Sequence, residues 1–250
     1  MKISIFGSTL QAAVFAGVFA ESGHLVHWCP QFSESQDVQI PEYQDQNVNQ
    51  LLEKQLKAGR LILKHNLIEQ FEHEVCLLSY ASMELALAER VINDIVQKNI
   101  IPKLVINGST LGLNMTQQLS QRLSQSKWAY LPDNIQEGNA LTSVLSLKRL
   151  IVGVDQESAK QLIVELFRPQ FPAKHQYLFM PILDAEFTKL SISGMLATRI
   201  SFMNDLANVS EKLGIDIQNV QQGLASDSRI GASYLSAGAG FGGENFSHDI

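Results

Sequence analysis

The first residues that could do chemistry form a tight turn near the amino terminus, Gly7-Ser8-Thr9-Leu10. This turn separates a short apolar run from a stretch with helical spacing, as the phosphate-binding turn of a dinucleotide-binding βαβ unit does. The usual pattern there is G-x-G-x-x-G, in which each glycine removes a side chain from a crowded place. Here the three positions are Gly7, Thr9 and Ala12, so a β-branched side chain points to where a pyrophosphate would lie.

The other half of that pattern is an acidic residue at the end of the second strand, which holds the ribose hydroxyls. The second apolar run, residues 24–28, is followed by Cys29 and then by Pro30 at the expected acid position. Glu34 and Asp37 come later, in a polar loop. Two interpretations stay open: the unit retains NAD binding, or it keeps the fold and no longer binds NAD well.

The elements that must position this turn alternate between strand and helix. Residues 3–6 predict a buried strand, residues 11–22 a helix and residues 24–28 a second strand. Further helices are predicted over residues 47–58, 83–98 and 157–167, and further strands over residues 60–63, 75–79 and 103–107. This alternation predicts an α/β fold, with a doubly wound Rossmann-type sheet in a domain of residues 1–180.

A long helix is predicted over residues 183–213, because no proline interrupts this stretch. At 1.5 Å per residue it would be roughly 45 Å long. Small or apolar residues recur on two of its faces, one including Phe187 and Ala197 and the other Ile200 and Met203. A helix buried on more than one side is typical of a spine between domains or a subunit contact. We therefore expect a helical second domain over residues 181–250, and a homodimer through this helix.

Composition limits the function classes. The chain has 250 residues and a net charge of −6, without the clustered Lys and Arg of a nucleic-acid-binding surface. Its two cysteines, Cys29 and Cys76, lie in apolar runs and predict reduced core thiols in a cytoplasmic protein. No apolar run reaches the ~18 residues of a membrane span. The six histidines are scattered, so no metal site is expected.

The carboxyl-terminal part adds a family resemblance. The segment EFTKLSISGMLATRISFMNDLANVSEKLGID, followed by DSRIGASYLSAGAGFGGENFSHD, resembles the central segment of the UDP-glucose/GDP-mannose dehydrogenase family. In that family a helix lysine, an asparagine one turn later and a cysteine in a GG-x-C-F-P-K-D loop oxidise a sugar alcohol to an acid. Lys189 matches the lysine and Asp249 the final aspartate. Ser193 stands at the asparagine, Asn245 at the nucleophilic cysteine and His248 at the loop lysine.

Earlier segments resemble the same family. Ser82 keeps a hydroxyl where the family has the threonine of V-x-T-P, and Thr110 matches the threonine of its K-S-T turn. A Ser-Thr pair there is also ordinary turn or helix-capping chemistry. LPDNIQEGNA resembles S-P-E-F-L-R-E-G-x-A and places Asp133 and Glu137 at two family glutamates. A carboxylate beside a reacting hydroxyl orients a water or takes a proton, which suits Glu137, whereas Asp133 also suits a helix-start acid.

The resemblance implies an NAD-linked site and a nucleotide-sugar substrate, in a family that makes sugar acids for surface polysaccharides. Arg229, in D-x-R-I-G, matches an arginine that reaches the sugar nucleotide across the family dimer. The implied site residues are, for catalysis, Lys189, Asp249, Glu137 and Thr110; for the cofactor, Gly7, Thr9, Leu10, Ser82 and Thr110; and for the substrate, Arg229 and Ser193.

The departures from the family pattern at Thr9, Pro30, Ser193, Asn245 and His248 predict a degenerate member of the family. The member is also expected to be truncated, since the family continues well beyond the position of Ile250. The family reaction removes two hydrides and passes through a covalent adduct of the cysteine with an aldehyde. An amide nitrogen is not nucleophilic, so with Asn245 the four-electron reaction is expected to be absent. The alternative is an NAD-dependent oxidoreductase that still converts the alcohol to the aldehyde, with Lys189, Glu137 and a water handling protons. A third hypothesis is a regulator of an intact paralogue through a mixed dimer.

Overall fold

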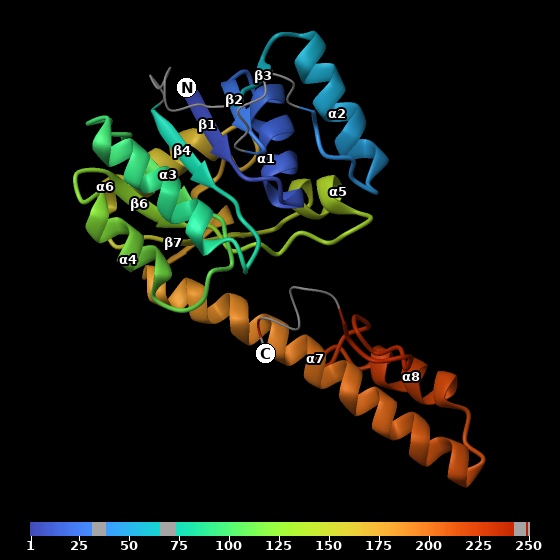
Figure 1. The fold of residues 1–250 in the computed structure, drawn as a ribbon. Helices are drawn as coiled ribbons and strands as arrows, with labels where there is room; N and C mark the ends of the chain where they lie inside the picture. Colours follow the sequence, from blue (N-terminus) through green and yellow to red (C-terminus); the bar gives the residue numbers. More distant parts are fainter. Residues whose placement is uncertain (32–38, 66–73, 243–248, 250) are drawn as a thin grey trace. The chain divides into compact units, whose positions relative to one another are not determined.

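The computed structural model describes residues 1–31, 39–65, 74–242 and 249, and within these residues one sheet organises the amino-terminal part (Figure 1). Its strand order is β3-β2-β1-β4-β5-β6-β7-β8. Neighbouring strands run parallel, except that β6 and β7 pair antiparallel. The strands are β1 (Lys2–Phe6), β2 (Leu25–Cys29), β3 (Leu61–Leu63), β4 (Val75–Leu78), β5 (Leu104–Asn107), β6 (Lys127–Tyr130), β7 (Leu150–Gly153) and β8 (Tyr177–Met180).

Helices cover both faces of this sheet. The helices are α1 (Leu10–Glu21), α2 (Gln46–Lys57), α3 (Leu85–Gln97), α4 (Met115–Arg122), α5 (Ala140–Leu145), α6 (Glu157–Phe167), α7 (Ile182–Leu213) and α8 (Ile217–Ser226), with the 3-10 turn η2 (Lys174–Gln176) before β8. One buried cluster joins α1, α2, α5 and α6 to the sheet, and a second joins α3, α4 and the start of α7 to it. The result is a three-layer α/β/α arrangement.

Successive side chains along each strand point alternately to the two faces of the sheet, and so into one or the other buried cluster. Ile3 and Ile5 belong to the cluster with α1, whereas Phe6 belongs to the cluster with α3. In β4, Leu77 faces the first cluster and Cys76 the second. Because successive strand side chains point to opposite faces, a run that is apolar throughout is what a sheet covered on both sides requires.

The sheet has a topological switch point at β1. This strand pairs with β2 on one side and with β4 on the other, so the chain winds outward in both directions from it (Figure 1). In open α/β sheets, ligands bind outside the carboxyl ends of the strands at such a point. The turns that follow Phe6 of β1 and Leu78 of β4 meet there.

The prediction of an α/β fold with a doubly wound sheet and a long helix over residues 183–213 is confirmed. The antiparallel β7, the strand β8 and the helix α8 were not anticipated from the sequence. The chain divides into two compact units, Met1–Phe187 and Thr188–Ile250. In the described part of the second unit, the buried apolar side chains are Ala197, Met203 and Leu235.

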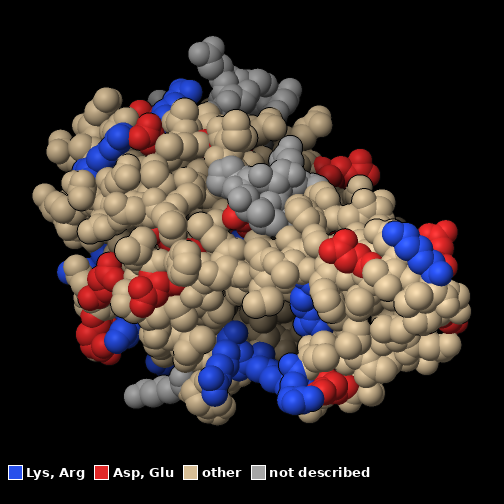
Figure 2. Space-filling view, turned by 90° about the horizontal axis from the view of Figure 1, so that it is seen from below, with Lys and Arg blue, Asp and Glu red and all other residues tan. Residues whose placement is uncertain are grey.

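Charged side chains of both signs are mixed on the face of the molecule seen from below (Figure 2). On the face shown in Figure 2, lysine and arginine side chains lie in small groups among aspartate, glutamate and uncharged residues. Among the described residues, no helix is both long enough and apolar enough to cross a membrane.

Candidate functional site

The turn after β1 requires its first glycine. Gly7 has φ +108°, a conformation that L side chains rarely adopt, and its N–H donates to the carbonyl of Cys29 at 3.0 Å. A Cβ added at Gly7 would lie 1.9 Å from the carbonyl oxygen of Ser79. The turn therefore packs against the end of β4 so closely that no side chain fits between them.

Thr9 occupies the second glycine position and caps α1. Its Oγ1 accepts a hydrogen bond from the N–H of Ala12 at 3.1 Å, and it also hydrogen-bonds the hydroxyl of Ser79. Threonine is a favoured N-cap because its oxygen satisfies one of the unpaired N–H groups in the first helical turn. The side chain at this position is thus engaged by the protein itself.

Gln11 completes this cluster and was missed by sequence reasoning, as was Ser79. Gln11 is only 1% exposed; its Nε2 donates to the carbonyl of Leu131 at 3.2 Å, and its Oε1 accepts from Ser79 at 3.0 Å. A usable signal was present, since Gln11 is the one uncharged polar side chain in the otherwise apolar helix LQAAVFAGVFAE. A buried amide of this kind needs partners, and those partners come from strand ends far away in the sequence.

The ends of β4 and β5 carry a second set of polar contacts. Ser109 accepts from the N–H of Tyr80 at 2.8 Å, and its own N–H donates to the side chain of Asn107 at 3.0 Å. Ser109 therefore joins two strand ends. These contacts fit the turn interpretation of this Ser-Thr pair and not the helix-capping one, because the next helix begins only at Met115. Thr110 follows and is buried, at 9% exposed, whereas Ser82 lies half-buried in the turn after β4.

The structure thus brings five predicted residues to the carboxyl edge of the sheet, after β1, β4 and β5. They are Gly7, Thr9, Leu10, Ser82 and Thr110.

Two further predicted residues, Asp133 and Glu137, lie in the loop between β6 and α5. Asp133 accepts from the N–H of Ile135 at 3.1 Å within that loop, and α5 begins only at Ala140, so the helix-start interpretation of Asp133 is wrong. Glu137 is exposed in the same loop.

In the second compact unit, three predicted residues form a buried cluster. Lys189 Nζ lies 3.1 Å from Asp249 Oδ2, and the Ser193 hydroxyl donates to the same oxygen at 2.6 Å. Lys189 also donates to Ser193 Oγ at 3.3 Å. Lys189 is 7% exposed and Ser193 4%. A buried ammonium group and a buried carboxylate each need an opposite charge, which this pairing supplies.

Two predicted departures, Asn245 and His248, lie outside the described residues. Arg229 is described and does not join the lysine cluster. Its side chain is 88% exposed and pairs with Asp227, with Nη2 2.6 Å from Oδ2. Hydrogen bonds from Arg229 lower the pKa of the Asp227 carboxyl.

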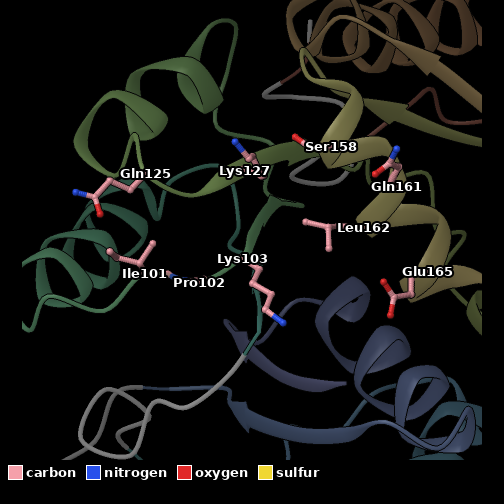
Figure 3. Close-up of a pocket in the computed structure, with 9 residues that line it drawn as sticks. All are labelled: Ile101, Pro102, Lys103, Gln125, Lys127, Ser158, Gln161, Leu162 and Glu165. Atoms are coloured by element: carbon pink, nitrogen blue, oxygen red, sulfur yellow. The ribbon is translucent and has the colours of Figure 1, made fainter.

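A pocket of about 490 Å³ opens at the opposite edge of the sheet, near the amino ends of β5 and β6 (Figure 3). Lys103, Lys127, Ser158 and Glu165 are among the residues that line it. Lys103 is already paired with Glu74, with Nζ 2.6 Å from Oε1. This pocket contains none of the predicted site residues, and ligands of such sheets bind at the carboxyl edge instead.

Comparisons with known proteins find similarity to nucleotide-sugar dehydrogenases. The model of the UDP-glucose/GDP-mannose dehydrogenase family, central domain, matches residues 183–250. The UDP-glucose 6-dehydrogenase of Pseudomonas aeruginosa is 28% identical over 276 residues, an alignment that covers 100% of this chain and 60% of the relative. The UDP-glucose 6-dehydrogenase YwqF of Bacillus subtilis is 36% identical over 156 residues, covering 62% of this chain and 34% of the relative.

A solved structure shows the same fold over nearly the whole chain. It is a UDP-glucose dehydrogenase from the archaeon Pyrobaculum islandicum, with a TM-score of 0.86 and 24% identity, covering 99% of this chain and 62% of that one. The chain therefore spans about three-fifths of the length of the Pseudomonas aeruginosa and Pyrobaculum islandicum proteins. The match of residues 183–250 to the family's central domain and the similarity to such enzymes over the full length of this chain support membership of the UDP-glucose/GDP-mannose dehydrogenase family.

Proposed function

We propose that this chain is a nucleotide-sugar dehydrogenase-like protein that does not perform the four-electron oxidation of its family. The observation that carries the proposal is the residue at the position of the family nucleophile, Asn245. A carboxamide nitrogen shares its lone pair with the carbonyl and does not attack an aldehyde. Without that covalent adduct, the second oxidation step has no route.

The contact between Lys189 and Asp249 supports the alignment on which this proposal rests. In the family loop GG-x-C-F-P-K-D the aspartate follows the cysteine by four positions, as Asp249 follows Asn245. Lys189 lies 3.1 Å from Asp249, so the two residues that match the family are paired. If residues 242–249 were wrongly aligned with the family loop, a contact between Lys189 and Asp249 would not be expected.

Replacement of the family asparagine by Ser193 removes a further donor. An asparagine amide has two N–H donors, whereas a serine hydroxyl has one. Ser193 gives its proton to Asp249 at 2.6 Å, so it has none to offer a sugar hydroxyl. Lys189 has three N–H donors and, within the described residues, gives two of them, to Ser193 and Asp249, so one remains. This remaining donor is the observation that favours the alternative, an oxidoreductase restricted to alcohol-to-aldehyde oxidation.

We also propose that the chain forms a homodimer through the helix of residues 183–213. Apolar side chains at Met195, Phe202, Val209 and Leu213 are exposed, between 50% and 67%, in the single chain. The first three recur every seven residues, so they line one stripe of α7. Such a stripe needs a covering surface, and a second copy of the same stripe is the simplest one. Cytoplasmic location and a role in polysaccharide synthesis remain predictions.

Turnover of UDP-glucose and GDP-mannose with NAD⁺ tests the proposed function. Products are separated by liquid chromatography and identified by mass, with a trapping hydrazide present to retain any aldehyde. We expect no sugar acid above the level of a protein-free blank. Aldehyde without acid would support the two-electron alternative, and acid formed by the unmodified chain would overturn the proposal.

A further inference from the structure

We propose that the turn at which a dinucleotide pyrophosphate would lie is closed by the chain's own side chains, so that the chain does not bind a nicotinamide dinucleotide there. The residues present do not fit that group, and no step of the chemistry is assigned to it. The proposed function concerns the loop around Asn245, whereas this inference concerns the turn after β1. The two can therefore fail separately.

The hydrogen bonds of the turn form one chain with a defined direction. Ser79 has one hydroxyl proton and donates it to Gln11 Oε1 at 3.0 Å. The hydrogen bond between Thr9 and Ser79 must then be donated by Thr9. Gln11 in turn donates to the carbonyl of Leu131 at 3.2 Å. These side-chain protons are thus committed within the protein, and a bound phosphate would have to compete with internal bonds already made.

One N–H group at the helix end is also engaged. Helix N-termini bind phosphate because their first N–H groups point outward without partners. In α1 the N–H of Ala12 donates to Thr9 Oγ1 at 3.1 Å. In the usual pattern a glycine stands where Thr9 stands, and its missing side chain is what lets the pyrophosphate approach the backbone.

Packing beneath the turn is tight. A Cβ added at Gly108, which follows β5, would lie 2.2 Å from Gln11 Oε1, so the amide fills the room that a larger residue would take. The Tyr43 hydroxyl donates to the carbonyl of Ser8 at 2.8 Å. This hydrogen bond ties the loop before α2 to the turn after β1.

The ribose side of the site lacks the usual acid at the end of β2. An acid at the end of the second strand holds the ribose hydroxyls in the usual pattern. Here β2 ends in Cys29, which is 1% exposed and is followed by Pro30. The Cys29 thiol lies 3.5 Å from the carbonyl oxygen of His65 and 3.6 Å from that of Gln31. A thiol between two main-chain carbonyls offers no strong acceptor to a ribose hydroxyl.

The experiment titrates the full chain with NADH and follows nucleotide fluorescence and calorimetric heat. We expect no saturation for the unmodified chain at millimolar NADH. In Thr9→Gly the side chain that closes the turn is removed, and glycine is an accepted N-cap, so the variant should fold. We expect Thr9→Gly, or Thr9→Gly with Pro30→Asp, to bind NADH at least tenfold more tightly than the unmodified chain.

The matched control is Asp216→Gly, which changes the N-cap of α8 in the same way and leaves the turn after β1 intact. It should not alter the response to NADH. Saturation of the unmodified chain at micromolar NADH would overturn the inference, as would two well-folded Thr9 variants with no gain in binding. NADH binding without formation of sugar acid would overturn this inference and leave the proposed function standing.

Discussion

At the residue scale, two buried acids, Asp45 and Glu186, serve the backbone. Asp45, which is 5% exposed, accepts from the N–H groups of Asn47 and Val48 in α2 and from that of Ala140 in α5, the last at 2.7 Å. Glu186, at 3% exposed, accepts from the N–H of Thr116 at 3.0 Å in α4. Each carboxylate satisfies donors at a helix start, where negative charge is favoured by the helix dipole. Buried acids here are therefore not by themselves a sign of catalysis.

Two partly buried histidines make stability depend on pH. Burial lowers the pKa of His24, with a smaller effect of the amino terminus, and burial lowers the pKa of His27, with smaller effects of Lys64 and Lys2. In the unfolded chain each keeps the ordinary value of 6.5, so below it the unfolded state binds more protons. The contribution of the two neutral histidines to the free energy of unfolding should therefore be fully present above pH 6.5. It should be lost as the pH falls below that value.

Urea midpoints measured across this range check that prediction. The double variant His24→Gln with His27→Gln should show a flatter dependence than the unmodified chain. Since carboxylates titrate at lower pH, the comparison is made above about pH 5. A midpoint that rises as the pH falls through this window would contradict the assignment.

At the scale of the elements, α1 and α8 are opposites. Ten residues of α1 are buried, so this helix is apolar all round and enclosed between the sheet and its neighbours. In α8 no residue is buried. The long helix α7 is intermediate, with Met203 buried and Phe202 54% exposed. These differences decide where substitutions matter.

The turn that feeds α1 should be the most sensitive glycine site. Gly7→Ala places a Cβ 1.9 Å from a main-chain oxygen at φ +108°, so strain and overpacking together should cost roughly 2–5 kcal/mol. Gly59→Ala is the matched control, because φ is +69° there and nothing lies within 4 Å. It should cost only about 1–2 kcal/mol. Chemical denaturation of both variants measures the loss in free energy of unfolding. An equal loss in Gly7→Ala and Gly59→Ala would contradict the packing argument.

The exposed stripe of α7 predicts self-association. Phe202→Lys puts a charge into the centre of the stripe and should shift the protein from dimer to monomer, judged by light scattering after size exclusion. The monomer mass is 27.7 kDa. Ser201→Lys, one position away and also exposed, is the control and should leave the dimer intact. A monomeric unmodified chain would refute the proposed dimer.

At the scale of the whole molecule, the two compact units differ in how much apolar surface they bury. The first contains both large clusters around the sheet. The described part of the second buries few apolar side chains, among them Met203 and Leu235. Local opening is easier where few apolar contacts hold an element, so stability should be uneven along the chain.

Hydrogen exchange resolves this difference. Amides of Ile217–Ser226 in α8 should exchange at least a hundredfold faster than those of Leu10–Glu21 in α1. The measurement is mass spectrometry of peptic fragments over a time course, at a concentration that keeps the oligomeric state constant. Equal protection of the two helices would mean that α8 is covered in solution by a surface absent from the single chain.

The sequence by itself determined the alternation of strands and helices, the long helix and the alignment of Lys189 with the family. These are local signals, since periodicity and motif spacing are written in neighbouring residues. It also pointed to Thr9 as the residue that disturbs the phosphate-binding turn. The prediction of α/β class rested on these signals alone.

Only the tertiary structure decided how the turn is closed. Gln11 meets Ser79 across 68 positions and Leu131 across 120, and Asp45 meets Ala140 across 95. The antiparallel placement of β7 and the loop position of Asp133 are likewise set by packing against distant segments. Contacts between residues so far apart leave no periodic trace in one sequence, so they follow from the folded sheet and not from local pattern.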